Sequence, residues 1–177
     1  MTLNEAERII EGLIFASSKP ISSAEIGEIV ELEKEAVQVI IEKLMKEKYN
    51  ERSGLMIRFV AGGYQLVTRP EISPWIDRLG RPVIQAPLST ASMETLAIIA
   101  YEQPITKSEI EKIRGVRSDS ALNTLIDREL VTDVGRKDGP GRPLLYGTTD
   151  VFLEQFGLDS LNSLPDKKLF EDEKNKS

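Results

Sequence analysis

The side chains that carry most acid–base and metal chemistry are missing from this sequence of 177 residues, which contains no histidine and no cysteine. The chain therefore lacks the commonest general base, the commonest metal ligand, and any thiolate or disulfide. Asp127 and Glu129 are close in sequence, but two residues apart on an expected helix they do not face each other. We find no acid–base pair and expect no catalytic residue, no metal and no cofactor, so we predict that the protein is not an enzyme. A hydrolase that uses carboxylates alone is an alternative in principle.

The segment GRKDGPGRP, residues 135–143, could be taken for a phosphate-binding loop. It lacks the Gly-Lys-Ser/Thr ending with which such loops open a helix and hold magnesium. From Lys137 to Gly141 the residues instead predict a rigid turn, because glycine adopts positive φ and proline removes a donor from a strand ladder. Arg142, between Gly141 and Pro143, would be presented on this stiff turn, where it could pair with a carboxylate or with backbone carbonyls of a partner.

Basic residues near this turn could neutralise the phosphates of a DNA duplex. The candidates for such contacts are Arg114, Arg117, Arg136 and Lys137. Acidic residues are interleaved with them and leave residues 114–142 almost neutral, whereas a non-specific duplex binder needs a surface of one sign. The net charge of −6 repels a phosphate backbone as well. Two other interpretations of these basic residues therefore remain beside DNA binding. They could form a solvated surface with a few ion pairs, or a surface that binds a protein.

A helix and a hairpin must position these residues. Ser118 can cap a helix whose apolar face carries Ala121, Leu122, Leu125 and Ile126. The alternating run from Val131 to Arg136 and the run from Leu144 to Tyr146 predict two strands joined by the turn. A helix followed by such a hairpin is typical of the last helix and the wing of a winged-helix domain.

The N-terminal part of the sequence predicts the same order of elements. A first helix has Asn4 as its expected cap, and the capping box Ser22-x-x-Glu25 opens a second helix. A third helix starts near Glu33, and the runs LMIRFV and YQLVT around a glycine pair predict a hairpin. One more short helix, with Trp75, follows the hairpin.

An internal repeat relates the two halves of the chain. A shift of 84 positions pairs Pro20 with Pro104, Ile21 with Ile105, Glu25 with Glu109, Ile26 with Ile110 and Ile29 with Ile113. We therefore predict a mainly α fold with small β-hairpins (α+β), made of two tandem winged helix-turn-helix domains at residues 1–80 and 88–164. The proline-bearing residues 81–87 form the expected linker. Asp150 is the expected cap of a short helix after the second wing, and residues 165–177 are expected to be a disordered tail of mixed charge.

Composition limits where the protein can act. With 40% hydrophobic residues, the chain can fill two small cores. No apolar run approaches the roughly 20 residues that cross a bilayer. The N-terminus, MTLNEAERII, carries acids where a secretory signal needs basic residues ahead of an apolar block. We expect a cytoplasmic protein without a membrane partner.

Three stretches resemble the bacterial segregation and condensation protein B family: LSTASMETLAIIAYEQPITKSEIEKIRGV, GRKDGPGRPLLYGTT and FLEQFGLDSL. The likeness covers nearly the whole chain and is most specific in the second domain. It implies a non-enzymatic subunit of the bacterial condensin complex, which supports chromosome condensation and segregation at the nucleoid. It also implies a homodimer, formed chiefly by the N-terminal domains, that grips the kleisin subunit, segregation and condensation protein A. The SMC ATPase would be reached through the kleisin, and contact with DNA would be indirect.

The resemblance also suggests residues for these contacts. Candidates for binding the kleisin, or for shaping its groove, are Glu94, Tyr101, Arg136, Gly141, Arg142, Pro143 and Tyr146. Some of them have structural alternatives, because Gly141 and Pro143 can set the turn and Tyr146 can fill the core. For dimerisation the candidates are Ile9, Leu13 and Val37. The rival hypothesis is a transcription regulator that binds DNA directly through the second winged helix.

Overall fold

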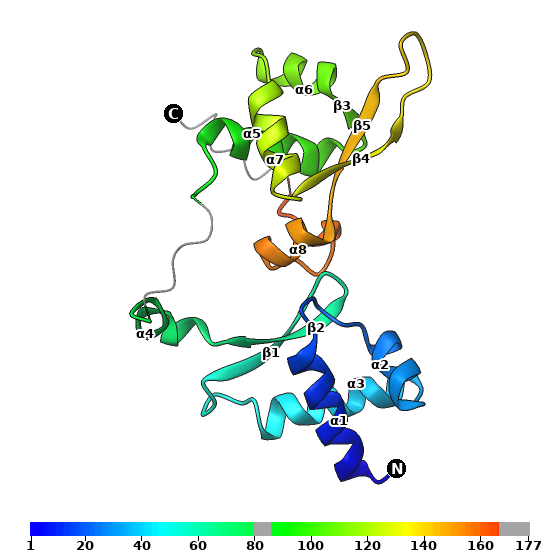
Figure 1. The fold of residues 1–177 in the computed structure, drawn as a ribbon, viewed down its shortest axis with the longest axis vertical. Coiled ribbons are helices and arrows are strands. Elements are labelled where there is room, and N and C mark those ends of the chain that lie inside the picture. The colour runs from blue at the N-terminus through cyan, green and yellow to red at the C-terminus, as the bar shows by residue number, and fades with distance from the viewer. Residues whose placement is uncertain (80–85, 167–177) are drawn as a thin grey trace. The chain divides into compact units, whose positions relative to one another are not determined.

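The computed structural model describes residues 1–79 and 86–166, and the chain divides into two compact units, Met1–Ile84 and Gln85–Ser177 (Figure 1). Both units are mainly helical with a small antiparallel sheet, which confirms the predicted α+β fold. Of the expected linker at 81–87, residues 81–85 lie outside the described residues, as do residues 167–177 of the expected tail.

The first unit contains three helices, a hairpin and a short helical end. Its elements are α1 (Leu3–Ala16), α2 (Ser23–Val30), α3 (Lys34–Glu47), β1 (Leu55–Val60), β2 (Gly63–Thr68), the 3-10 turn η1 (Pro70–Ile72) and α4 (Ser73–Asp77). Ala61 and Gly62 both have positive φ and form the two-residue turn that joins β1 to β2. The predicted order of helices and hairpin is therefore confirmed.

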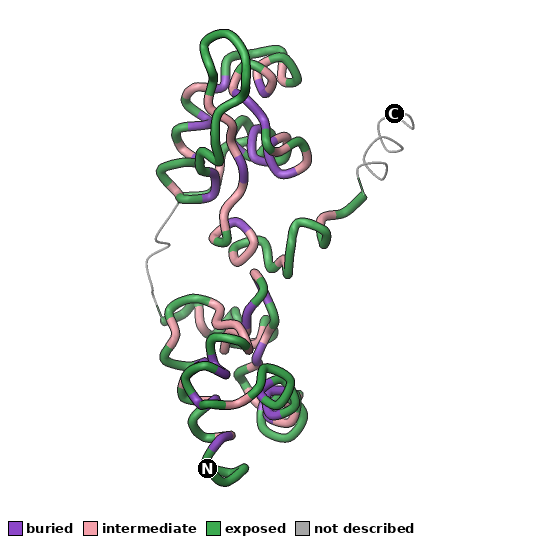
Figure 2. The backbone as a smooth tube through the Cα atoms, turned by 90° about the vertical axis from the view of Figure 1, so that its right-hand side faces the viewer, coloured by how far each residue is buried: buried purple, intermediate pink, exposed green. Residues whose placement is uncertain are grey.

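One apolar stripe from each of α1, α2 and α3 fills the core of the first unit, whose buried residues are marked in Figure 2. Its fully enclosed side chains include Ile10, Ile26, Val37 and Ile41. The hairpin closes this core, and Ile21, between α1 and α2, forms a backbone bridge with Tyr64 of β2. The two hydrogen bonds of this bridge measure 3.0 and 2.8 Å.

The second unit repeats this arrangement with a longer hairpin. Its elements are α5 (Thr90–Glu102), β3 (Ile105–Thr106), α6 (Lys107–Arg114), α7 (Asp119–Asp127), β4 (Val131–Arg136), β5 (Leu144–Thr148), α8 (Asp150–Phe156) and the 3-10 turn η2 (Leu161–Ser163). Its three-stranded sheet has the order β3-β5-β4, and Ile105 pairs with Tyr146 of β5. Leu96, Ile99 and Ile110 lie in a second, separate core.

The internal repeat is confirmed by the structure. Ile26 and Ile110 are both fully buried, and Ile21 and Ile105 both pair with the second strand of their own hairpin. Ile29 and Ile113, which the repeat also pairs, are both exposed, at 57% and 56% of their surface. The two copies therefore preserve their exposed positions as well as their core.

Capping boxes begin helices in both units. Ser22 with Glu25 caps α2, as predicted, and Thr106 with Glu109 makes the matching capping box of α6. The carboxylate of Glu109 accepts hydrogen bonds from the backbone N–H of Thr106 at 2.9 Å and from its hydroxyl at 2.7 Å. It also forms an ion pair with Lys137, the first residue of the loop between β4 and β5. The hydrogen bonds from Lys137 and then from Thr106 lower the pKa of Glu109 to about 2.

Three expected caps differ in the structure. Thr2 caps α1 in place of Asn4, because Thr2 and Glu5 have the same capping-box spacing one half-turn earlier. Ser118 is the N-cap residue of α7, but its side chain makes no capping bond, and its hydroxyl accepts a hydrogen bond from Arg114 at 3.0 Å. Thr149 caps α8 in place of Asp150, which lies inside the helix.

We predict that Gly63→Ala destabilises the first unit by about 1–3 kcal/mol. A Cβ at Gly63 would lie 2.8–2.9 Å from backbone atoms of Pro20 and Ile21, which cannot move without breaking the Ile21–Tyr64 bridge. Urea unfolding followed by the fluorescence of Trp75 would measure the change. Gly54→Ala is the control, since its Cβ meets one ordinary contact at 3.6 Å, and we expect a change below about 0.5 kcal/mol. Equal effects of both substitutions would contradict the close-packing argument.

We also predict a pH dependence from Glu109, whose pKa falls from 4.5 to about 2 on folding. A carboxyl with a lowered folded-state pKa adds stability above its unfolded pKa and loses that contribution as the pH falls through the folded pKa. Glu109→Gln should therefore lower the urea midpoint of the second unit above pH 4.5, and the difference from the unsubstituted protein should shrink towards pH 2. Circular dichroism at a series of pH values would test this. A difference that stays constant with pH would show that the ion pair and cap do not act through ionised Glu109.

Candidate functional site

The hairpin of the second unit ends in a turn built by its own sequence. Arg142 donates its backbone N–H to the carbonyl of Gly139 at 3.2 Å, and Pro140 and Gly141 occupy the two central positions of this turn. Gly141 has a φ of +76°, as the third residue of a type II turn requires. The backbone N–H of Lys137 donates to Pro143 at 2.9 Å and closes the loop. The predicted rigid turn is therefore present, and it extends away from the helices of its unit (Figure 1).

Two arginines lie at this turn. The guanidinium of Arg136 donates to the carbonyl of Arg142 at 3.0 Å, so the two residues are neighbours across the loop. Arg142 itself has a φ of +38°, a conformation that costs a residue with a Cβ about 1–2 kcal/mol. Both side chains are exposed, and among the described residues no carboxylate pairs with either guanidinium.

Glu94 lies elsewhere, on α5, in a network that joins three helices. Arg114 of α6 donates to the Glu94 carboxylate at 3.1 Å and to the Ser118 hydroxyl at 3.0 Å. The Arg114 side chain is only 8% exposed, and its Nε is buried without a hydrogen-bond partner among the described residues. Arg114 therefore holds α5, α6 and the start of α7 together and offers little surface to a ligand, whereas Glu94 stays exposed at the rim.

Tyr101 and Tyr146 are tied into the second unit. The Tyr101 hydroxyl donates to the carbonyl of Pro165 at 2.8 Å and links α5 to the end of the described chain. Tyr146 is part-buried on β5, where it pairs with Ile105 and packs against the core. The kleisin-binding candidates thus occupy three places: the rim of α5 with Glu94, the two structural tyrosines, and the turn with Arg136, Gly141, Arg142 and Pro143.

The helix expected to enter a DNA groove is acidic. Within α7 the charged residues are Asp119 and Asp127, and no lysine or arginine lies between its ends. Arg117 donates to Asp119 at 3.2 Å, and Lys107 forms an ion pair with the same carboxylate and lowers its pKa. With Arg114 buried and Lys137 paired to Glu109, most of the candidate DNA-contacting cations are neutralised by carboxylates of their own domain. This surface does not suit a phosphate backbone.

The dimerisation candidates of the first unit differ in exposure. Ile9 of α1 is 40% exposed, and Leu13 is part-buried against the core. Val37 has no exposed surface, so its side chain packs inside its own domain and leaves a dimer contact to Ile9 and Leu13. Gly12 and Ala16, one turn further on, are also exposed on α1 and continue a second apolar stripe beside the buried one.

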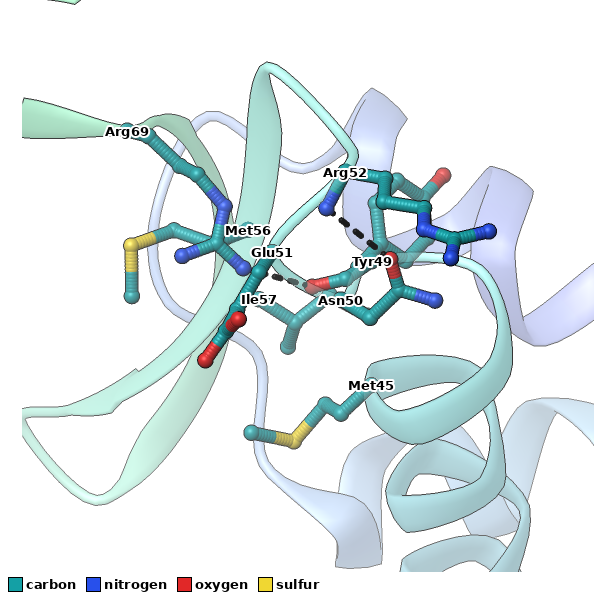
Figure 3. Close-up of a pocket in the computed structure, with 8 residues that line it drawn as sticks. All are labelled: Met45, Tyr49, Asn50, Glu51, Arg52, Met56, Ile57 and Arg69. Atoms are coloured by element: carbon teal, nitrogen blue, oxygen red, sulfur yellow. Dashed lines mark hydrogen bonds between the residues drawn. The ribbon is translucent and has the colours of Figure 1, made fainter. Parts of the chain in front are cut away.

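A hollow of about 490 Å³ opens in the first unit between the end of α3 and the hairpin (Figure 3). Its walls include the two thioethers of Met45 and Met56 and the side chain of Ile57. The guanidinium of Arg69 crosses one side and donates to the carbonyls of Ser53 and Tyr49, both at 3.0 Å. These bonds hold the turn after α3 against the hairpin, so the hollow has a fixed rim.

Sequence reasoning missed this hollow because its residues come from separate elements. Met45 lies in the last turn of α3, Met56 lies on β1 and Arg69 follows the hairpin, and no spacing rule relates the three. The usable signal was weak: two methionines, which suit adaptable binding surfaces, in elements whose other apolar residues are mostly valine, isoleucine and leucine.

No group of three or more His, Cys, Asp or Glu side chains is placed to hold a metal ion in residues 1–79 and 86–166. None of the helices in these ranges is long and apolar enough to span a membrane.

Comparison with known proteins identifies the family. The family model for the segregation and condensation complex subunit ScpB matches residues 8–167. Segregation and condensation protein B of Symbiobacterium thermophilum is 48% identical over 165 residues, which cover 93% of this chain and 75% of that protein. The protein of the same name from Halalkalibacterium halodurans is 44% identical over 166 residues, covering 93% and 84% of the two chains. A crystal structure of a dimer of the ScpB N-terminal domain complexed with ScpA peptide is 27% identical, with a TM-score of 0.42, and covers 44% of this chain and 96% of that one. The family model and the two full-length relatives agree along most of the sequence, and the chain belongs to the ScpB family of segregation and condensation complex subunits.

Proposed function

We propose that this protein is a non-catalytic subunit of the bacterial segregation and condensation complex that binds the kleisin ScpA as a homodimer. Through ScpA it acts with the SMC ATPase in chromosome condensation and segregation, in the cytoplasm and at the nucleoid. Membership of the ScpB family supports this proposal. ScpA is the partner in the related crystal complex, and it is the partner we propose for this chain.

The observation that carries the proposal is the charge arrangement of the second winged helix. Its α7 is acidic, Arg114 is buried against Glu94, and Lys107 and Lys137 are paired with Asp119 and Glu109. A duplex reader needs free cations along the groove-facing helix, because each neutralised phosphate contributes to affinity. Three of the four candidate DNA-contacting residues, Arg114, Arg117 and Lys137, already pair with carboxylates of their own domain, which suits a protein partner better than a duplex, so a transcription regulator is not favoured.

The homodimer is proposed to form along the outer stripe of α1. Ile9 and Leu13 lie one turn apart on this helix, and the exposed Gly12 and Ala16 permit a second helix to approach closely. The side chains buried beneath this stripe, Ile10 and Ile14, belong to the domain's own core. One helix can therefore serve two purposes, with one face in the core and the adjacent face against the partner.

ScpA is proposed to use the hollow of the first unit as a seat for an apolar side chain. Met45 and Met56 offer flexible apolar walls, and the Arg69 bonds keep the hollow open without a partner. A buried apolar anchor with a polar rim is the usual energetic centre of a protein interface. Arg52 and Glu51 supply such a rim in the same turn.

A direct test of the function is binding of purified ScpA from the same bacterium to the full chain, measured by calorimetry at low and at physiological salt after nuclease treatment. Apolar anchoring predicts an affinity that changes little with salt, whereas binding to a 30-base-pair duplex would fall steeply over the same range. Strong, salt-sensitive duplex binding without ScpA binding would overturn the proposal and favour the regulator.

We predict that the double substitution Met45→Gln and Met56→Gln weakens ScpA binding about tenfold or more, since two apolar contacts are replaced by polar ones of similar size. Met93→Gln, an exposed methionine on α5, is the matched control and should leave the affinity unchanged. Calorimetry reports both values, and unfolding curves confirm that the variants are folded. An unchanged affinity of the double variant would remove the hollow from the ScpA site.

We also predict that Ile9→Asp converts the dimer into a monomer of 19.8 kDa, because a carboxylate would be buried without a partner in the α1 stripe. Sedimentation equilibrium measures the mass. Ile113→Asp, at an equally apolar exposed position of the second unit, should leave the dimer intact. If Ile9→Asp remains dimeric, the interface lies on another face of the molecule.

A further inference from the structure

The turn at the end of the second hairpin contains one residue that does not suit its backbone. Gly135, Gly139 and Gly141 take three of the four positive-φ positions of this hairpin, where glycine is free of steric cost. The fourth is Arg142, with a φ of +38°. A glycine at position 142 would adopt this backbone conformation without steric strain. The fold of the turn therefore does not explain why the residue is an arginine.

No contact within the domain provides that explanation. The Arg142 side chain is exposed, and the described residues supply no carboxylate to its guanidinium. Its backbone does the structural work: the N–H donates to Gly139, and the carbonyl accepts from Arg136. Both of these backbone bonds would survive in a glycine variant.

Arg136 adds a second guanidinium at the same turn. One of its nitrogens is used by the carbonyl of Arg142, which fixes Arg136 beside the turn and leaves its other donors exposed. Arg136 and Arg142 thus bring two exposed cationic side chains to one turn, with no carboxylate among the described residues paired to either, and both would attract an incoming anion. The planar fork of arginine matches a carboxylate with two parallel hydrogen bonds.

A carboxylate suits this turn better than a DNA backbone. Asp133 and Asp138 lie exposed on the same hairpin, and α7 is acidic, so a row of phosphates would meet several negative charges. A single carboxylate needs only the two arginines at the tip. The closed loop, held by the Lys137–Pro143 bond, presents them with little loss of conformational freedom on binding.

We propose that Arg142, supported by Arg136, anchors an aspartate or glutamate side chain of the ScpA segment, and that its strained backbone is retained for this contact. The inference rests on the proposed function, because it names the chemistry that ScpA must bring to the second unit.

The test compares Arg142→Gly with Arg142→Lys in the full-length dimer. Arg142→Gly should raise or preserve the urea midpoint, since glycine relieves the strain, and yet weaken ScpA binding at least tenfold. Arg142→Lys keeps the positive charge but loses the planar guanidinium that can make two parallel hydrogen bonds. Its affinity for ScpA should therefore lie between that of the unsubstituted protein and that of Arg142→Gly. Arg117→Ala is the control: this arginine is exposed and paired with Asp119, and the variant should bind ScpA like the unsubstituted protein.

The outcomes separate the two proposals. If the unsubstituted protein binds ScpA and Arg142→Gly binds it equally well, the anchor is wrong and the proposed function stands. If the unsubstituted protein does not bind ScpA, both are overturned. If Arg142→Gly lowers the urea midpoint, the side chain serves the fold and the anchor is overturned. If Arg142→Gly instead loses affinity for a 30-base-pair duplex at physiological salt and keeps ScpA, the arginines belong to a DNA contact and the anchor is again wrong.

Discussion

Each domain of this protein depends on one short backbone contact, in which the isoleucine ahead of its second helix pairs with the second strand of its hairpin. Ile21 pairs with Tyr64 and Ile105 with Tyr146. A two-stranded hairpin alone is only marginally stable in water, and this contact joins it to the three helices. Gly63 has no room for a side chain because the backbone of Pro20 and Ile21 lies against it, and Gly147 lies close to the side chains of Gln103 and Val134. The hairpin therefore closes the core and is held in a fixed direction from it.

The two domains share this frame and differ in what they build on it. In the first unit the hairpin ends in a two-residue turn, and the hollow that we propose as a seat for ScpA lies between the end of α3 and β1. In the second unit the hairpin carries a longer loop, which Glu109 and Lys137 tie back to α6. Glu25, the repeat counterpart of Glu109, makes the capping box alone. An added ion pair thus accompanies the longer loop.

Charge pairing connects this architecture with function. A winged helix can read DNA only where its cations are free, and here carboxylates of the same domain occupy Arg114, Lys107 and Lys137. The surface also carries features of another kind: apolar residues on α1, two methionines around a hollow, and two arginines on a rigid turn. Apolar anchors together with a few placed charges are the features of a protein-binding surface. The family to which the chain belongs is consistent with that use.

Local chemistry allowed the sequence by itself to determine the order of elements, the repeat and the turn. Capping boxes, the Pro140-Gly141 turn and the helical stripes depend on residues within about one to two helical turns of each other, so their spacing was enough. Tertiary packing alone decided which of these residues are buried and which stay exposed. Periodicity marks an apolar face but does not say what covers it, so Val37 and Ile9 looked equivalent although one is buried and the other exposed. Arg114 became a buried link because Glu94, twenty positions away, lies beside it, and the hollow formed only where α3 meets the hairpin. These contacts join segments that are far apart in the sequence. They stabilise the protein only after folding has brought the segments together, so residue spacing does not reveal them.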